Sequence, residues 1–571
     1  MRITTAIAIA LVIPAFGSAE LKETALCGTF PGRGPLELAK HANSQERLAR
    51  SGGPREPQFL QAPRLEVSGD LVLMSDDGSI VTEANPFDLR ERTLAFSPAG
   101  SRAFLYRAGG GGIDAGAGDR IGIGDDVSRT FDLSFDFPFF GQSYRRLFLN
   151  SDGNFTFGEG DSASTARSLE RFLGGPPRIA LFFADLDATA GGEVRVLNGA
   201  DRFVVTWDAV PEWGKEEPST FQIEIVRDGT IYMRYGAVVS AAGGIVGVAP
   251  GGTGEGDVSL VDFGGESREI AGGIAERFLR GRTIDNLAVS RSFYRELSDS
   301  YDSLVVWTNF ESDLDDAFAY SVAVSNDASG TGDETYDFSE AWESEGELET
   351  YVFMGNLRRY PRDPNGRVLG AASRPTALAL LAHEVGHRFL TSAEIVHPGV
   401  AVDVLLGRQS MHWSFFLDTD ASFLEGNDIV EESPGRFRTV ETVSRYSRLD
   451  LYLMGLAEAS EVAPFFVVTG ASASVFGEPL DNESTPREGV AITGTRADLT
   501  IDEVIRALGE RRPRASEAPS TFRHAWVLLT RQNEPPSSED VAQLHDARNA
   551  FLGFFNEKTL GRGHIEIRIG R

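Results

Sequence analysis

The chain has 571 residues, 41% of them hydrophobic, and a formal net charge of −30 at pH 7. This acidic balance argues against nucleic-acid binding, which needs a basic surface to displace the counterions of the phosphates. The length exceeds what one hydrophobic core usually serves, so we expect a multidomain protein built from units of roughly 100–200 residues.

The N-terminus has the features of a secretory signal peptide. Arg2 precedes an apolar stretch over residues 3–16, and the small residues Gly17, Ser18 and Ala19 follow. We therefore expect cleavage after Ala19 and a secreted protein, released outside the cell or into the periplasm. No later segment approaches the roughly 20 uninterrupted apolar residues that a membrane span needs.

Cys27 is the single cysteine of the chain, which excludes an internal disulfide framework. The bulky Leu26 before it is atypical of a lipid-attachment motif, so we expect no lipid anchor. Its place near the signal peptide also makes Cys27 a poor candidate for a thiol that blocks a metal site.

Residues 20–125 are predicted to form an N-terminal β-rich and linker region. Apolar runs separated by turn-forming residues extend from about residue 65 to residue 104. A glycine-rich stretch at 109–124 follows, which marks a domain boundary or a long loop. Whether a propeptide lies between residues 20 and 109 stays open at this point.

Residues 126–285 are predicted to form an antiparallel β-sandwich. Short segments of alternating apolar residues recur, and Asp-Gly turns at 151–153 and 227–229 lie where hairpins would close. The expected strands are 131–137, 146–149, 154–157, 178–183, 193–197, 202–208, 221–226, 230–235 and 244–248. Their number and spacing favour a sandwich.

This region resembles the nidogen-type extracellular β domain. The resemblance is carried by FDFPFFGQSYRRLFLNSDGNFTFGE, ALFFADLD, DRFVVTWDAVPEWG and FQIEIVRDGTIYMRY, and it covers roughly 135 residues. It implies an adhesive or spacing module that contacts extracellular matrix or cell-surface components, not a catalytic one. Asp185 and Asp187 are interpreted as turn and surface residues in preference to metal ligands.

From about residue 286 the pattern changes to strands mixed with helices, and we assign 286–571 to a further domain with a C-terminal helical subdomain. The expected strands are 303–310, 319–324, 349–357 and 524–530, and the expected helices are 375–390, 449–457, 501–508 and 538–555. The segment after the first helix is predicted to be irregular. Pro375 suits a first helical turn, where a missing N–H costs nothing.

The motif that carries chemistry is HEVGH at residues 383–387, inside the apolar helix TALALLAHEVGHRFL. Residues i and i+4 lie on one helical face, so His383 and His387 can bind one zinc ion at about 2.0–2.1 Å. Glu384, next to the first ligand, is then placed to take a proton from the water that zinc activates. Two histidines and a glutamate inside an apolar helix would be costly to bury without such a partner.

A catalytic zinc site of this type needs a third protein ligand and keeps one position open. His412 is the first candidate, because it opens the aromatic segment HWSFFLDTD, where a buried histidine needs a partner. Glu425, which would give a His-His-Glu set, is second, and Asp450 is third. His397 lies in what looks like a surface turn and is a poorer candidate.

The span 357–456 resembles zincin-type metallopeptidase domains of secreted bacterial proteins, through LLAHEVGHRFL, HWSFFLDTDASFLEGND and RYSRLDLYLMGL. The resemblance implies an α+β zincin-like fold in which a strand upstream of the active helix adds the substrate as an extra strand, and 349–357 is expected to be that strand. It also makes Met454 a candidate for the methionine beneath the metal. Tyr446 and Tyr452 are candidate donors to the reaction's oxyanion.

These observations predict a secreted zinc metalloendopeptidase that acts on proteins or peptides, with Glu384 as general base. No G-x-S-x-G elbow is present, which disfavours a serine hydrolase. Two alternatives stay open. One is a zinc amidase that acts on a non-protein substrate, and the other is an extracellular adhesion or binding protein whose zincin-like domain is not catalytic.

Overall fold

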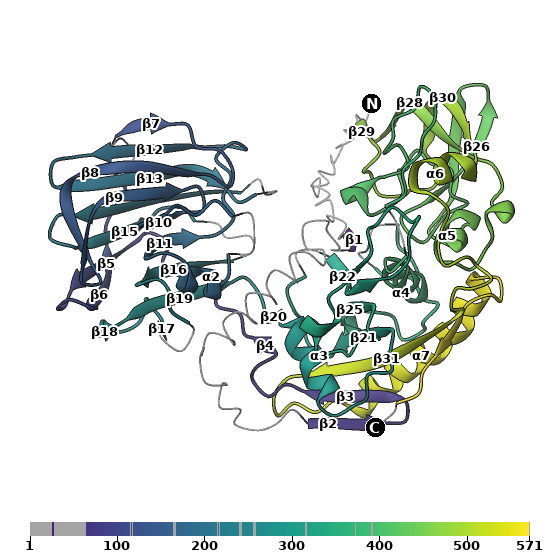
Figure 1. Ribbon diagram of the computed structural model, residues 1–571, viewed down its shortest axis with the longest axis horizontal. Helices are drawn as coiled ribbons and strands as arrows, with labels where there is room; N and C mark the ends of the chain where they lie inside the picture. Colours follow the sequence, from purple (N-terminus) through teal and green to yellow (C-terminus); the bar gives the residue numbers. More distant parts are fainter. Residues whose placement is uncertain are drawn as a thin grey trace, which may run out of the picture.

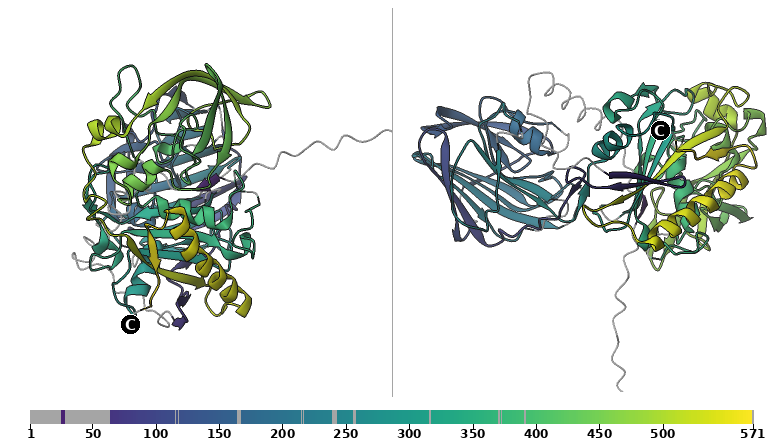
Figure 2. Two further views of the ribbon diagram at one scale, coloured as in Figure 1. Left: turned by 90° about the vertical axis from the view of Figure 1, so that its right-hand side faces the viewer. Right: turned by 90° about the horizontal axis from the view of Figure 1, so that it is seen from below.

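The computed structural model describes residues 25–27 and 64–569, apart from 115, 117, 164–166, 214, 216, 239–242, 255–257, 315–316, 370, 372 and 390–391. The expected signal peptide lies outside the described residues. The chain forms two lobes that lie side by side (Figures 1 and 2). Among the described helices, none has the length and apolar character that a membrane crossing requires.

The first lobe is a sandwich of two sheets whose neighbouring strands are antiparallel, except that β17 runs parallel to β19. One sheet has the order β17 (Val258–Leu260), β19 (Gly273–Leu279), β16 (Gly243–Ala249), β11 (Arg178–Phe183), β10 (Asn154–Thr156), β9 (Gln142–Asn150), β8 (Ser128–Phe139). The other has the order β18 (Glu269–Ala271), β6 (Ala103–Gly110), β5 (Arg92–Pro98), β15 (Ile231–Tyr235), β14 (Pro218–Val226), β13 (Arg202–Pro211), β12 (Glu193–Asn198), β7 (Asp119–Ile121). The short helix α2 (Leu169–Gly174) contacts β11 and β16.

The sandwich core is rich in aromatic residues because alternate side chains of each strand point inward. Along β8, Leu133, Phe135, Phe137 and Phe139 are buried while the residues between them are exposed. The two expected Asp-Gly turns do join antiparallel neighbours, β9 with β10 and β14 with β15.

The second lobe is built on a mixed sheet in the order β22 (Ala317–Ala323), β25 (Thr350–Asn356), β21 (Ser303–Thr308), β31 (Thr521–Thr530), β3 (Leu71–Ser75), β2 (Arg64–Ser68). The four inner strands are mutually parallel, and β22 and β2 run antiparallel to their neighbours. Beyond β22 lies β1 (Ala25–Cys27), which pairs with it in parallel, and β32 (His564–Glu566) pairs with the start of β31.

Both faces of this sheet are covered, because successive residues of each inner strand enter opposite cores. Val305 and Trp307 of β21 pack in the core that contains α4 (Ala377–Gly386) and α7 (Ser538–Lys558). Leu304 and Val306 pack in the core on the other side, which contains α3 (Asn286–Tyr294). These are the continuous apolar strands typical of a sheet buried on both faces.

A third, smaller sheet follows the metal-motif helix. Its order is β26 (Asn427–Ser433), β27 (Arg436–Thr442), β30 (Ala491–Leu499), β28 (Phe465–Val475), β29 (Glu478–Leu480), with its own small apolar cluster. The sequence prediction missed it, because most residues of β26, β27 and β30 are not buried, so these strands carry only a weak apolar pattern. The other elements are α5 (Arg448–Leu453), α6 (Ile501–Leu508), η3 (Ser339–Trp342), η4 (Leu357–Arg359), η5 (Arg408–Ser410), η6 (Ala459–Glu461), β23 (Ser325–Asn326) and β24 (Tyr336–Asp337).

The predicted N-terminal region 20–125 is not a unit of its own, which corrects the expected domain division. Its strands β2 and β3 complete the sheet of the second lobe, whereas β5, β6 and β7 belong to the sandwich. The glycine-rich stretch 109–124 lies within the sandwich, where it includes the end of β6, the connection to β7 and β7 itself. The chain leaves the second lobe through β4 (Val81–Thr82) and returns through β20 (Thr283–Ile284), and these two strands pair with each other.

Candidate metal site

The metal-motif helix α4 begins at an N-cap and is buried along its whole length. The Thr376 side chain accepts a hydrogen bond from the backbone N–H of Ala379, which satisfies one of the free donors of the first turn. Pro375 therefore lies just before the cap instead of in the first turn. All ten residues of α4 are buried, and His387 forms the C-cap.

Gly386 permits close packing at the end of α4. A Cβ added at Gly386 would come within 2.7 Å of the Leu424 side chain, so a larger residue would push the two segments apart. Leu424 lies between Phe423 and Glu425, both of which contribute to the site described below. The glycine therefore sets how closely the loop approaches the helix.

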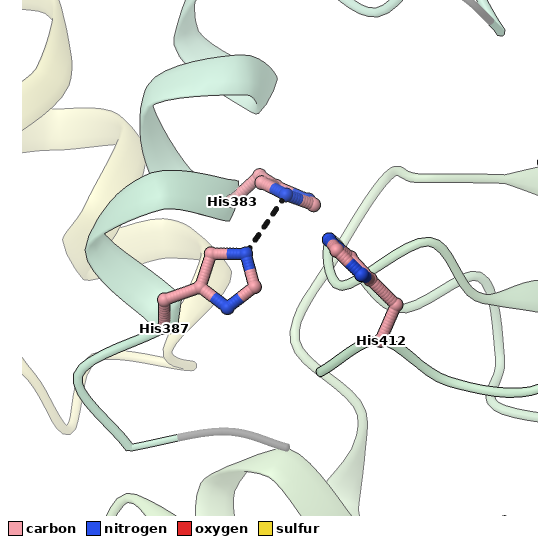
Figure 3. A group of neighbouring side chains, drawn as sticks. All are labelled: His383, His387 and His412. Atoms are coloured by element: carbon pink, nitrogen blue, oxygen red, sulfur yellow. Dashed lines mark hydrogen bonds between the residues drawn. The ribbon is translucent and has the colours of Figure 1, made fainter. Parts of the chain in front are cut away.

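Three histidines converge at this point. His383 and His387 come from α4 and its C-cap, and His412 comes from the loop that follows η5 (Figure 3). One ring nitrogen of each lies within 4.8 Å of the others, and Nε2 of His383 is 3.1 Å from Nε2 of His387. The three imidazoles are 0%, 6% and 0% exposed, in chain order.

Backbone carbonyls orient two of the rings. Nδ1 of His383 donates to the carbonyl oxygen of Phe423 at 2.7 Å, and Nδ1 of His412 donates to the carbonyl oxygen of Arg408 at 2.8 Å. A neutral imidazole carries one proton, so these bonds leave Nε2 of both rings unprotonated: Nε2 of His383 faces Nε2 of His387 at 3.1 Å, and Nε2 of His412 accepts from Nη2 of Arg408 at 3.1 Å. Histidines that bind metals typically donate their other ring N–H to a carbonyl or carboxylate in this way.

Burial keeps the three rings neutral. It lowers the pKa of His383 to about 4 and lowers the pKa values of His387 and His412 well below their usual range. A neutral imidazole is the form that binds a metal ion. The triad therefore presents ligand nitrogens at neutral pH.

The arrangement fits a tetrahedral zinc ion. Two nitrogens bound to such an ion at about 2.0–2.1 Å would lie about 3.3 Å apart, close to the 3.1 Å between the Nε2 atoms of His383 and His387. Three imidazoles are a recurrent zinc donor set that leaves one position open. Glu384, which follows His383 on α4, is fully buried.

Glu425 lies beside the triad, but its carboxylate forms an ion pair with Arg408. Its carboxylate accepts from Nη2 of Arg408 at 2.6 Å and from Nε at 2.9 Å, and Oε1 is 4.0 Å from Nε2 of His412. The alternative His-His-Glu set is therefore not the one that the structure assembles. The Arg408 contact had no signal in the sequence, because nothing in GRQSMHW marks the arginine.

Asp450, the third candidate ligand, is a supporting residue. Its carboxylate accepts from Nε1 of Trp413 at 2.9 Å, from Oγ of Ser422 at 2.6 Å and from the backbone N–H of Ser447 at 2.7 Å. Burial raises its pKa to about 6, against the opposing effect of these hydrogen bonds. Asp450 thus anchors the loop on both sides of the site.

The other candidates from the sequence lie elsewhere. The hydroxyl of Tyr446 donates to the Ala382 carbonyl at 2.6 Å, and that of Tyr452 accepts from the backbone N–H of Arg511 at 3.0 Å. His397 is 3.8 Å from Glu503, outside the triad. Met454 is buried in the same apolar core as α4.

The expected substrate-binding strand is also corrected. Strand β25 is paired on both sides, with β22 and with β21, so no edge of it is available to a peptide. Beyond β25 lies β22, which contacts α4. The other side of β22 pairs with the short strand β1, in the register Ala25↔Ala317 and Cys27↔Ala319.

Among the described residues, two groups of three aspartates also lie close enough to hold a cation. Unlike the three histidines, neither group is buried. Asp125, Asp126 and Asp185 approach one another, but Arg167 already pairs with Asp126 at 2.5 Å and with Asp185 at 2.8 Å. Asp187 accepts from the backbone N–H of Thr189, as expected of a turn residue, but it is buried and so is not the surface residue that the sequence predicted. The second group is Asp418, Asp420 and Asp428, of which Asp420 is exposed.

Comparison with known proteins gives one match. Residues 101–267 match the family model described as NIDO related, so the sandwich lobe contains a NIDO-related domain. No curated protein and no solved structure matches the chain. The match stops short of the second lobe, where the triad lies.

Proposed function

We propose that this chain is an exported zinc metallopeptidase whose active site is formed by His383, His387, His412 and Glu384, in a zincin-like α+β domain. The observation that carries the proposal is the convergence of three neutral imidazoles, two of them oriented through Nδ1 by backbone carbonyls, beside a buried glutamate on the same helix. A purely structural site needs ligands but no such glutamate.

His383, His387 and His412 would hold the zinc ion, which would supply Lewis-acid chemistry and make a water molecule acidic enough to react near neutral pH. The chain's own residues do the rest. Glu384 accepts a proton from the attacking water and delivers it to the leaving nitrogen, so no covalent intermediate with the protein is needed. The dry surroundings of the triad strengthen each of these electrostatic interactions.

The experiment that tests this proposal compares wild type with Glu384→Gln. We expect both proteins to contain one zinc per chain by metal analysis, and only the wild type to hydrolyse an unfolded protein substrate. Equal hydrolysis by the two proteins would exclude Glu384 as the base. Loss of zinc in His383→Ala and His412→Ala would establish the ligands independently of activity.

The burial of the triad favours a second candidate, in which the metal only stabilises the lobe and the protein binds surfaces through its NIDO-related domain. All three imidazoles and Glu384 are at most 6% exposed. Zinc present in the wild type, with no hydrolysis of protein, peptide or other amide substrates, would support this function over the peptidase. Hydrolysis of non-protein amides alone would instead indicate a zinc amidase.

A further inference from the structure

Trp213, in the sandwich lobe, is the exposed one among the six tryptophans, all of which lie in the described part of the chain. It is 60% exposed, whereas the other five are at most 2% exposed. A single exposed apolar side chain is ordinary on a protein surface. Trp213 is distinguished by its neighbours, which are carboxylates.

Trp213 lies directly opposite Asp185 in a short antiparallel ladder. The backbone N–H of Trp213 donates to the carbonyl oxygen of Asp185 at 2.7 Å, and Leu186 pairs with Glu212 at the next position. Opposite residues of such a ladder project to the same face, with Cβ atoms about 4.5–5.5 Å apart. Leu186 and Glu212 are buried, and the side chain of Asp185 is 41% exposed. The indole and the carboxylate therefore share the outer face.

Asp185 belongs to a group of residues in which negative charge exceeds positive charge. Carboxylate oxygens of Asp125, Asp126 and Asp185 lie within 4.8 Å of one another, and Arg167 contacts Oδ1 of Asp185 at 2.8 Å. Burial, together with the charges of Asp152, Asp126 and Asp125, raises the pKa of Asp185 to about 6 against the effect of Arg167. Arg167 thus leaves part of the negative charge uncompensated, which favours a further cation.

We propose that Trp213 and Asp185 form a recognition site for an arginine side chain of a partner protein. A guanidinium is planar, so it can stack on the indole while one of its N–H groups donates to the carboxylate. Arg167 engages Oδ1 of Asp185, whereas Oδ2 has no hydrogen-bond partner within the described part of the chain. The site lies in the sandwich lobe, so the inference stands whether or not the second lobe binds zinc.

A metal ion is a poorer occupant of this surface than an arginine. Nη2 of Arg167 lies 2.5 Å from the carboxylate of Asp126 and 2.8 Å from that of Asp185, so a guanidinium already fills the position between them. A metal ion would also leave the indole uncovered. The exposed Trp213 beside Asp185 is the feature that an arginine, with its flat and charged end, matches on both sides.

The test measures the binding of a fluorescently labelled, blocked pentapeptide of alternating glycine and arginine to the purified protein, by anisotropy. The same peptide with citrulline in place of arginine keeps the shape without the charge, and it should bind at least tenfold more weakly. Asp185→Asn should lower the affinity for the arginine peptide about tenfold or more, because a charge-assisted hydrogen bond is lost. Trp213→Ala should lower it about two- to fivefold.

Asp136→Asn is the matched control, because it removes an exposed carboxylate of the same lobe, and it should bind the peptide as wild type does. An equal loss of affinity in this control would mean general attraction to an acidic surface and would overturn the inference. Equal affinity in wild type, Asp185→Asn and Trp213→Ala would also overturn it. Trp213→Ala keeps the test decisive if Asp185→Asn, which removes a partner of Arg167, fails to fold.

A second measurement needs no peptide. Because the other five tryptophans are buried, collisional quenchers of fluorescence reach mainly Trp213. Caesium ions should quench wild type more strongly than Asp185→Asn, and iodide should quench it less strongly, because the carboxylate attracts cations to the indole. Identical quenching in the two proteins would contradict the proposed pairing of Trp213 with Asp185. Binding of calcium in place of the peptide would make the carboxylates a metal site and overturn the inference.

Discussion

The indole Nε1 of Trp413 donates a hydrogen bond of 2.9 Å to Oδ1 of Asp450, and both residues are buried. Trp413 follows the candidate ligand His412, and Asp450 caps the first turn of α5. The same carboxylate binds Ser422, next to the residue whose carbonyl orients His383. One aspartate thus connects helix α5 to the two loop segments that shape the triad.

We expect Asp450→Asn to weaken both zinc binding and folding. Its three partners in the structure all donate, so an amide of the same shape must present its NH₂ group to at least one donor. The expected loss of unfolding free energy is about 1–3 kcal/mol, with zinc affinity reduced about tenfold or more. Denaturant titration and chelator competition measure the two effects. Asp502→Asn, at an exposed position of α6, is the control, and an Asp450→Asn protein with unchanged zinc affinity would refute the supporting role.

The buried ion pair between Asp161 and Arg178 should stabilise the sandwich lobe. Arg178 is fully buried, 2.6 Å from Asp161 and 4.6 Å above the Phe183 ring. Against the effect of burial, the hydrogen bond from Arg171 and the charge of Arg178 lower the pKa of Asp161 to about 2. Asp161→Asn leaves the guanidinium buried without this counter-charge, which costs about 3–5 kcal/mol.

Asp136→Asn provides the comparison, because it breaks an exposed pair with Arg145 of the same lobe. Exposed pairs contribute about 0–1 kcal/mol, so thermal unfolding of this variant should differ little from wild type. Similar losses in both variants would contradict the assignment. Because the folded pKa of Asp161 is depressed, its contribution is present above pH 3.8 and disappears as the pH falls toward 2.

Because His524 is buried in its neutral form, we expect the protein to lose stability in mild acid. Burial, with a smaller effect of Arg388, lowers its pKa to about 3, whereas an unfolded histidine titrates near 6.5. Between these values the unfolded chain binds the extra proton, so stability falls with decreasing pH by about 1.4 kcal/mol per pH unit.

The measurement is denaturant unfolding of metal-free protein at pH 6.5 and pH 5. We expect the change between the two conditions to be about 2 kcal/mol smaller in His524→Gln than in wild type. His564→Gln, at an exposed position, should keep the wild-type difference. If the free energy of unfolding changed equally with pH in all three proteins, His524 would not be buried in its neutral form.

Removal of residues 20–60 should increase peptidase activity, if the proposed function holds. Strand β1 occupies the outer edge of β22, the edge at which an extended peptide could add to the sheet beside α4. A strand tethered to the same chain competes at an effective concentration near the millimolar range, so we expect KM for an extended peptide to fall about threefold or more. Unchanged KM with a normally folded truncated protein would exclude competition at this edge.

The sequence predicted the elements with strong periodicity. The nine sandwich strands expected between residues 131 and 248, and α4, α6, α7 and β31, lie close to the expected positions, because alternation and apolar helical faces are local signals; the sandwich strands β17, β18 and β19 were missed. The sequence also ranked His412 above the other third-ligand candidates, and the structure brings it to His383 and His387. Whether the triad binds zinc stays a prediction.

Long-range pairings were missed for physical reasons. Nothing local in residues 71–75 indicates that they pair with β31, whose partner residues lie more than 400 positions later. The expected edge role of 349–357 was wrong because an interior strand and an edge strand can share the same apolar pattern. Arg408 was missed because an arginine in a turn has no pattern until its partners, Glu425 and His412, are placed.

The paired crossing strands β4 and β20 have a mechanical consequence. The backbone N–H groups of Asn85 and Asp285 extend the ladder by bonding to Leu279 and Ile80, so the two passages of the chain form one short ribbon. A ribbon of two strands resists twisting in a way that a single linker does not. The two paired passages therefore restrict the rotation of the sandwich relative to the second lobe. A protease that cuts one passage would leave the sandwich attached by the other. If the sandwich binds a surface, this connection would limit the orientations in which the candidate metal site of the second lobe faces that surface.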